Sequence, residues 1–298
     1  MEKQRIHLGY LLLSLTLLVC FSCEKPAADN GEDNGQSTDD MVELTVHISN
    51  FKQVAFTTQR RSEKRAIAEL CNRIDVAILQ DKNKVKGINQ TSNDKDFGHF
   101  SLSLPKGSYT ILIIAHNGLG TATLTNPEAV TFEKNKVTDT FYYCNAITLN
   151  GNQTINADMQ RAVAAFCLEV NDTTPSNVRQ MKFYYTGGSS TLNARSGTGC
   201  VKSRQTEVLN VPDGAHTGKS AYTIYTFPRE DSEELKIVVT ALDENGKDIF
   251  SKTFEHVPIT LRQKSIYSGR FFDGDSGDGG DSFIIRGDDV WTEHHSTY

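Results

Sequence analysis

The chain has 298 residues, a formal net charge of −6 and 38% hydrophobic residues, which is enough apolar content to fill a core. Its length suggests one large or two ordinary domains. Proteins that bind nucleic acid need clustered Lys and Arg side chains to neutralise phosphates, and this mildly acidic composition argues against that class.

The N-terminus has the layout of a bacterial lipoprotein signal. A basic start is followed by the apolar run of residues 11–19 and then by Ser22 and Cys23. The run is too short to span a bilayer comfortably, so we expect a cleaved signal peptide over residues 1–22. A Cys directly after a small residue predicts thioether lipidation of Cys23, so that the mature protein is anchored to a membrane by its N-terminus. An ordinary signal with an incidental Cys is the alternative, because Cys20 stands where such signals usually carry Leu.

The first folded part is expected over residues 41–155, after an acidic, polar tether over residues 23–40 that cannot form a core. It opens with a strand, since apolar residues alternate with polar ones from Val42 to Ile48. A basic run follows, with Arg residues at 60, 61 and 65. Arg60, Arg61 and Arg65 are interpreted as part of a solvated loop or, alternatively, as a processing site for an Arg-specific protease.

Further strands follow in both halves of the chain. Residues 98–104 alternate, Pro105–Gly107 form a turn, and the apolar run 108–115 predicts a strand buried on both faces. A second domain is expected over residues 156–298, opened by a strand over 158–170, and the Asn-Gly signal in 243–247 predicts a hairpin turn. Short strands separated by turns predict an all-β protein with two β-sandwich domains.

The last residues, 273–298, combine a flexible acidic Asp/Gly spacer with a strand-forming segment that contains Phe283, Ile285, Val290 and Trp291. The spacer lacks the Gly and Glu positions of an EF-hand loop. No nucleophile elbow, HExxH, P-loop or CxxC motif is found in the sequence. We therefore expect no enzyme, no cofactor and no metal site. Free thiols and a Cys144–Cys167 disulfide both remain open for the cysteines after Cys23.

Three segments in order carry a resemblance to a known family. They are LPKGSYTILIIAHN (104–117), MQRAVAAFCLEVNDTTPSNVRQMKFYYTGGSSTLNARSGTG (159–199) and HVPITLRQKSIYSGRFF (256–272). Together with the lipoprotein signal, they resemble the fimbrillin-anchor family, FimB-like subunits of the type V pili of Bacteroidia. The chain departs from the family pattern at His116, where Trp is common, and at Gln263, where Asn is frequent.

The resemblance implies two tandem transthyretin-like β-sandwiches and assembly with other pilus subunits by strand exchange, in which a terminal strand completes a neighbour's sheet. It implies a cell-surface pilus subunit, either an outer-membrane anchor or an accessory subunit. The segment with Phe283, Ile285, Val290 and Trp291 is then the candidate donor strand. Two alternatives stay open: a shaft or tip fimbrillin processed near Arg60–Arg65, and a monomeric glycan-binding lipoprotein that uses Tyr184, Tyr185 or Trp291.

Overall fold

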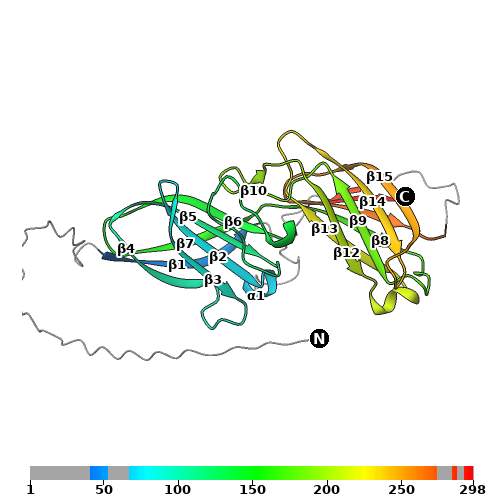
Figure 1. The fold of residues 1–298 in the computed structure, drawn as a ribbon, viewed down its shortest axis with the longest axis horizontal. Coiled ribbons are helices and arrows are strands. Elements are labelled where there is room, and N and C mark those ends of the chain that lie inside the picture. The colour runs from blue at the N-terminus through cyan, green and yellow to red at the C-terminus, as the bar shows by residue number, and fades with distance from the viewer. Residues whose placement is uncertain (1–40, 53–66, 274–283, 287–291, 298) are drawn as a thin grey trace, which may run out of the picture. The chain divides into compact units, whose positions relative to one another are not determined.

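The computed structural model describes residues 41–52, 67–273, 284–286 and 292–297, all within one compact unit, Thr38–Tyr298. The elements are β1 (Met41–Lys52), α1 (Ile67–Leu70), β2 (Arg73–Gln80), β3 (Asn83–Thr91), β4 (His99–Pro105), β5 (Gly107–His116), η2 (Glu133–Asn135), β6 (Phe141–Leu149), β7 (Gln153–Arg161), β8 (Ala164–Val170), β9 (Gln180–Thr186), β10 (Leu192–Asn193), β11 (Thr198–Gly199), β12 (Arg204–Asn210), η3 (Asp213–His216), β13 (Ser220–Thr226), β14 (Glu234–Leu242), β15 (Asp248–Pro258), β16 (Gln263–Gly269), β17 (Ile284–Arg286) and β18 (Thr292–Thr297). The prediction of an all-β fold is confirmed (Figure 1).

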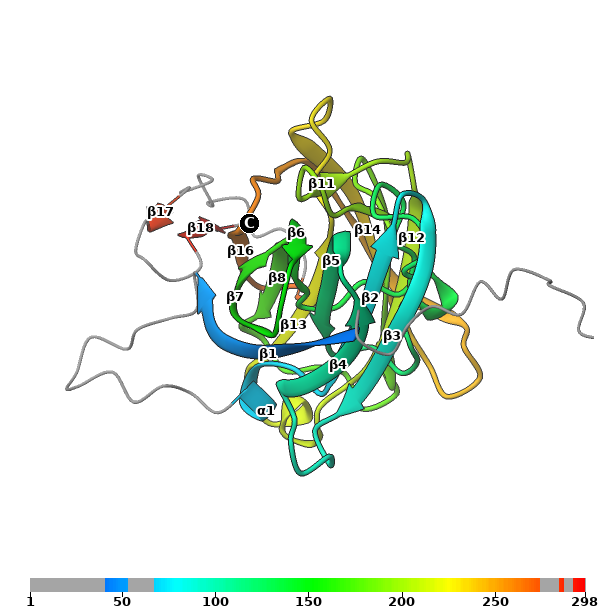
Figure 2. The ribbon, with the colours of Figure 1, turned by 90° about the vertical axis from the view of Figure 1, so that its left-hand side faces the viewer.

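The first half of this unit is built on one seven-stranded sheet with the order β3-β2-β5-β6-β7-β1-β4. The sheet curves strongly, as Figure 2 shows, and residues from six of its strands meet in one apolar core. Strand β5 is buried on both faces, as its sequence predicts. Ile111 and Ile113 point into this core, whereas Leu112 and Ile114 join a second apolar cluster on the opposite face.

Two facing sheets form the second half. One has the order β12-β9-β14-β15, and the other has the order β13-β8-β16-β18-β17. Their inward side chains alternate with outward ones along β9 and β14, and they share a core that includes Phe166, Phe183 and Ile237. This packing of two sheets on a common core is a β-sandwich. The predicted hairpin turn between β14 and β15 is present, with Gly246 at φ 75°.

The chain passes from the seven-stranded sheet to the sandwich between Arg161 and Ala164. The run 158–170, expected as one strand, is instead the end of β7 followed by β8. Strand β7 ends at Arg161, whose side chain is held in place at this point. Its Nε donates to Asp139 over 2.8 Å, and its guanidinium lies 4.8 Å from the ring centroid of Phe141. The change of sheet thus falls inside the region assigned to the second domain, and the division into domains at residue 155 stays a prediction.

A buried polar cluster joins β2, the end of β5 and the loop that follows. Asp75 Oδ2 accepts hydrogen bonds from His116 Nε2 at 2.9 Å and from the backbone N–H of Ala122 at 2.7 Å. Because the N–H of Gly118 donates to His116 Nδ1 over 3.0 Å, the imidazole proton is assigned to Nε2. The amide nitrogen of Asn89, in the orientation that satisfies its neighbours, donates to Asp75 Oδ1 over 3.1 Å. The cluster fastens the loop after β5 to the sheet.

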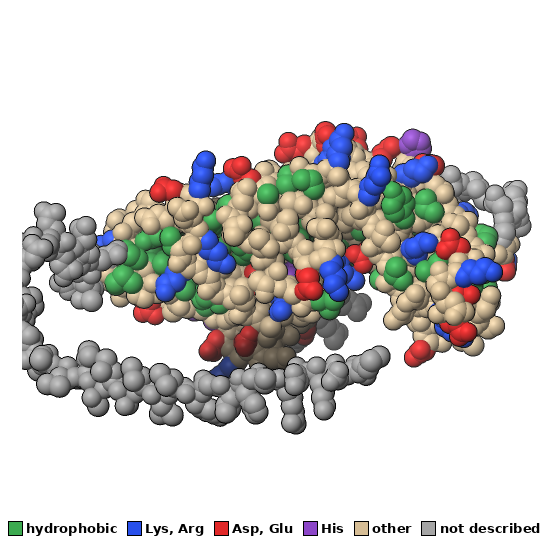
Figure 3. Space-filling model, viewed as in Figure 1, with side chains coloured by type: hydrophobic (Ala, Val, Ile, Leu, Met, Phe, Trp, Pro, Cys, Tyr) green, Lys and Arg blue, Asp and Glu red, His purple; other side chains and the backbone are tan. Residues whose placement is uncertain are grey.

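Positive and negative side chains are interspersed on the face drawn in Figure 3 and do not gather there into one large basic patch. The described helices are all too short or too polar to cross a membrane. Within the described ranges, Cys71, Cys144, Cys167 and Cys200 form no disulfide, and no group of three or more His, Cys, Asp or Glu residues is placed to hold a metal ion.

Candidate assembly site at the first strand and the C-terminal edge

Strand β1 lies inside the seven-stranded sheet, with a neighbour on each side. It pairs antiparallel with β4, from Met41 opposite Pro105 to His47 opposite His99. On its other side it pairs in parallel with β7, starting with Leu44 opposite Gln153. In the strand order of the described sheet, β1 alone lies between β7 and β4, so it occupies a slot one strand wide.

The inward side chains of β1 belong to the apolar core. Val42, Leu44, Val46 and Ile48 are between 0% and 6% exposed, as their alternation predicts. Burying a Val, Leu or Ile side chain contributes about 1.5–3 kcal/mol, so the four together contribute on the order of 6–12 kcal/mol. As a result, β1 is held by the same interactions that stabilise the core around it.

Polar contacts hold the outward face of β1 to both neighbours. The Thr45 and Ser101 hydroxyls lie 3.0 Å apart, and the Nδ1 atoms of His47 and His99 lie 2.7 Å apart. Toward β7, Ser49 Oγ donates to Asp158 Oδ1 over 3.3 Å. The sequence assigned His47 to the polar side of the strand, but it gave no indication that His99 would lie opposite it.

The candidate processing residues follow β1 in the chain. Arg60, Arg61 and Arg65 lie between Lys52, where β1 ends, and Ile67, where α1 begins, and are outside the described residues. A cut there would separate β1 covalently from β2 and all later strands. Cys23 also lies outside the described residues, and its lipidation stays a prediction.

The C-terminal segment lies at the edge of the five-stranded sheet. Strand β18 pairs in parallel with β16, from Thr292 opposite Gln263 to Thr297 opposite Ser268, and β17 pairs antiparallel with β18. Of the four candidate donor residues, Ile285 falls in β17, whereas Phe283, Val290 and Trp291 are outside the described residues. The chain therefore covers the edge of its own β16 with its own terminus.

Asp172 fixes the point from which this segment leaves the sandwich. Its carboxylate accepts hydrogen bonds from three consecutive backbone N–H groups, those of Phe271, Phe272 and Asp273, over 2.7–2.9 Å. Asp172 is 7% exposed, so these bonds are largely shielded from water. Sequence reasoning missed this residue, because the acceptor and its donors lie about a hundred positions apart.

Replacing Asp172 with Ala should lower the free energy of unfolding by about 2 kcal/mol, because buried donors that lose a charged acceptor are costly. Urea denaturation measures the loss. Asp213→Ala, which removes an exposed carboxylate, is the matched control and should change stability by less than about 0.5 kcal/mol. Equal effects of the two substitutions would show that Asp172 does not fasten the chain end.

The aromatic residues proposed as a glycan platform do not form one in the described structure. Tyr185 is fully buried in the sandwich core, and its hydroxyl donates to the carbonyl of Tyr225 over 3.0 Å. Tyr184 points outward on the same strand and is 39% exposed. Trp291 lies outside the described residues. Tyr184 alone thus provides an accessible ring among the described candidates.

The fold and this strand arrangement define an all-β protein of the sandwich type. The family model for fimbrillin-A associated anchor proteins Mfa1 and Mfa2 matches residues 36–264. The chain belongs to this family of fimbrillin-associated anchor proteins. A comparison with curated proteins gave no match.

Solved structures of proteins from Bacteroides and Porphyromonas align with this chain. A candidate adhesin from Bacteroides ovatus aligns at 10% identity and a TM-score of 0.45, covering 72% of this chain and 82% of its own. A candidate polysaccharide-binding protein from Bacteroides thetaiotaomicron aligns at 12% identity with a TM-score of 0.42. The alignment covers 70% of this chain and 79% of that protein. The fimbrial anchor protein Mfa2 from Porphyromonas gingivalis aligns at 15% identity with a TM-score of 0.37. The alignment covers 71% of this chain and 82% of that protein.

Proposed function

We propose that the protein is an outer-membrane anchor or accessory subunit of a fimbria, held by lipid at Cys23 and joined to other subunits by strand exchange. The burial of β1 in the slot between β4 and β7 is the observation that carries the proposal. A subunit whose slot is filled by its own strand cannot accept a neighbour's strand there. Such a subunit ends a chain of strand exchanges, as an anchor must.

The alternative is a shaft or tip subunit that loses β1 after a cut near Arg60, Arg61 or Arg65. The burial of β1 makes this alternative harder to achieve, because a cut leaves the four inward side chains of β1 in the core. Proteolysis alone would therefore give a nicked protein that still holds β1. Release would further require a competing strand that replaces the buried area and the backbone hydrogen bonds.

N-terminal analysis of the protein recovered from assembled fimbriae separates the two roles. An anchor should begin at a lipidated Cys23, and mass spectrometry should detect the acylated N-terminal peptide. A protein that begins between Arg61 and Ala66 and lacks the peptide of residues 41–52 would contradict the anchor proposal. A protein cut there that still carries this peptide would be nicked but not exchanged, and would leave the slot filled as proposed.

The C-terminal segment is the proposed donor, and donation requires β18 to leave β16. Paired cysteines test this directly, because Tyr267 and Ser296 are opposite each other in the β16–β18 register. In a Cys200→Ser background, which removes the exposed native thiol, an oxidised Tyr267→Cys/Ser296→Cys variant should fail to join neighbouring subunits and should recover after reduction. The single Ser296→Cys variant is the control and should assemble under both conditions.

Deleting residues 282–298 provides a second test of the same step. We expect the deletion to abolish attachment of fimbriae to this subunit while the sandwich still folds, since its core ends at Phe271. Normal fimbrial attachment and length in the deletion strain would refute donation by this segment. The anchor role itself would survive that result, because it rests on β1 and Cys23.

A further inference from the structure

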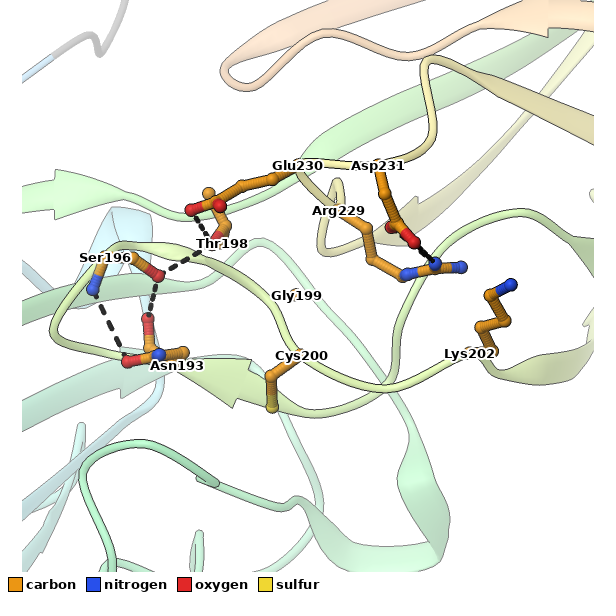
Figure 4. Close-up of a pocket in the computed structure, with 9 residues that line it drawn as sticks. All are labelled: Asn193, Ser196, Thr198, Gly199, Cys200, Lys202, Arg229, Glu230 and Asp231. Atoms are coloured by element: carbon orange, nitrogen blue, oxygen red, sulfur yellow. Dashed lines mark hydrogen bonds and ion pairs between the residues drawn. The ribbon is translucent and has the colours of Figure 1, made fainter.

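A hollow of about 510 Å³ lies beside the β10–β11 hairpin (Figure 4). Its walls come from the segment 193–202 and from the turn 229–231 that follows β13. Pockets that hold small ligands in proteins span roughly 300–1,000 Å³, so the hollow has a suitable size.

The walls of the hollow are fixed by the backbone. The N–H of Gly199 donates to the carbonyl of Pro228 over 2.7 Å, which ties the two segments together. Gly197 has φ 79°, and a Cβ at this position would overlap the hydroxyl of Tyr142. A Cβ on Gly199 would overlap the side chain of Ser189. Both glycines therefore permit the β10–β11 hairpin to pack closely against Tyr142 and Ser189, which fixes the position of this wall.

One end of the hollow carries amide, hydroxyl and carboxylate groups. Ser196 Oγ and Thr198 Oγ1 lie 2.7 Å apart, and Thr198 Oγ1 donates to Glu230 Oε1 over 3.4 Å. Asn193 uses its side-chain oxygen to accept from the backbone N–H of Arg195 over 3.0 Å. Among the described residues, the Asn193 amide nitrogen and the second Glu230 oxygen have no partner. This end thus offers a free donor next to a free acceptor.

The other end carries cationic groups. The Arg229 side chain is 9% exposed and forms an ion pair with Asp231, whose side chain is 64% exposed. Figure 4 shows Lys202 extending toward this pair from the opposite wall, whereas Cys200 points away toward the sheet. Within the described part of the chain, the Lys202 ammonium has no partner. It adds a second free donor, across the hollow from Glu230.

The lining carries two cations, Lys202 and Arg229, and two carboxylates, Glu230 and Asp231. These charges cancel, so the hollow has no net charge that would favour a strongly ionic ligand. Separated donors and acceptors without net charge match a neutral ligand with several hydroxyl groups, each of which both donates and accepts. We propose that this hollow binds a neutral saccharide, with Asn193, Lys202 and Glu230 making its hydrogen bonds.

Saturation-transfer NMR on the purified protein tests the site with two probes of the same shape, methyl glucopyranoside and methyl glucuronopyranoside. We expect saturable transfer to the neutral glycoside. The charge-neutral variant Lys202→Ala/Glu230→Ala should weaken its binding at least tenfold, since two charge-assisted hydrogen bonds are lost. Both side chains are exposed, so the variant should remain folded.

Glu244→Ala/Lys247→Ala is the matched control, because it removes one exposed acid and one exposed base from the β14–β15 turn beside a separate hollow. It should bind the glycoside as the parent protein does. The proposal is overturned if no saturable transfer occurs, if the two double variants lose binding equally, or if the glucuronide binds more tightly than the neutral glycoside. The test uses the unassembled protein, so its result is independent of the anchor proposal.

Discussion

Replacing Leu44 with Asp should lower the free energy of unfolding by at least about 4 kcal/mol. Leu44 is fully buried in the middle of β1, between β4 and β7. The substitution removes its apolar contacts and places a carboxylate among the buried hydrophobic side chains of the core. Urea denaturation followed by circular dichroism measures the change, and the variant should also be cut more readily by proteases.

Thr45→Asp is the matched control, because it introduces the same carboxylate one position further along β1 on the outward face. It breaks the contact with Ser101 but leaves the core intact, so we expect a loss below about 1 kcal/mol. If both variants lost the same stability, β1 would not be inserted between β4 and β7, and the anchor proposal would lose its main support.

Replacing Asp75 with Leu should lower the free energy of unfolding by about 3 kcal/mol or more. The side chains of Asp75 and His116 are each 1% exposed, so water cannot replace the lost acceptor. The substitution leaves two buried donors, His116 Nε2 and the N–H of Ala122, without their acceptor, and each buried unpaired donor costs about 1–3 kcal/mol. Asn89 is exposed, so its amide can donate to water instead. Urea denaturation again provides the measurement.

Two further variants show whether the hydrogen bonds of Asp75 are the cause. Asp75→Asn retains one acceptor oxygen at nearly the same volume and should lose less stability than Asp75→Leu. Asp94→Ala removes an exposed carboxylate that accepts from the N–H of Thr91, and it should cost below about 1 kcal/mol. A loss for Asp75→Leu no larger than that for Asp94→Ala would exclude a structural role for the cluster.

Strands with strict alternation or long apolar runs could be predicted from the sequence. The period of two from Val42 to Ile48 correctly indicates the inward face of β1, and the run before His116 correctly indicates a strand buried on both sides. These patterns are local consequences of burial. In contrast, β3 is exposed over most of its length and carries Lys84 and Lys86, so its sequence looks like a solvated turn.

Strand β12 could not be predicted because its buried positions carry polar residues, whereas β3 is difficult to predict because it is exposed. Its inward positions include Gln205 and Glu207, which sequence patterns assign to solvent. Distant residues provide partners for their oxygens: Thr226 Oγ1 donates to Gln205 Oε1 over 2.9 Å, and Lys136 Nζ lies 3.1 Å from Glu207 Oε2. Among the described residues, the Gln205 amide nitrogen has no partner. Likewise, Asp172 and the hollow depend on residues brought together only by the complete fold, and a single sequence carries no signal for such contacts.

The parallel pairing of β1 with β7 has a mechanical consequence for a protein fixed at its N-terminus. In the lipid-anchored subunit that we propose, the membrane would hold the near end of β1. Beyond Arg161, β7 continues into the β-sandwich, so a pull on that half would act at the far end of β7. Two parallel neighbours pulled at opposite ends are loaded in shear, and all their backbone hydrogen bonds resist together rather than opening one after another. Drag from flowing liquid would thus act along the direction in which this pair of strands resists rupture most strongly.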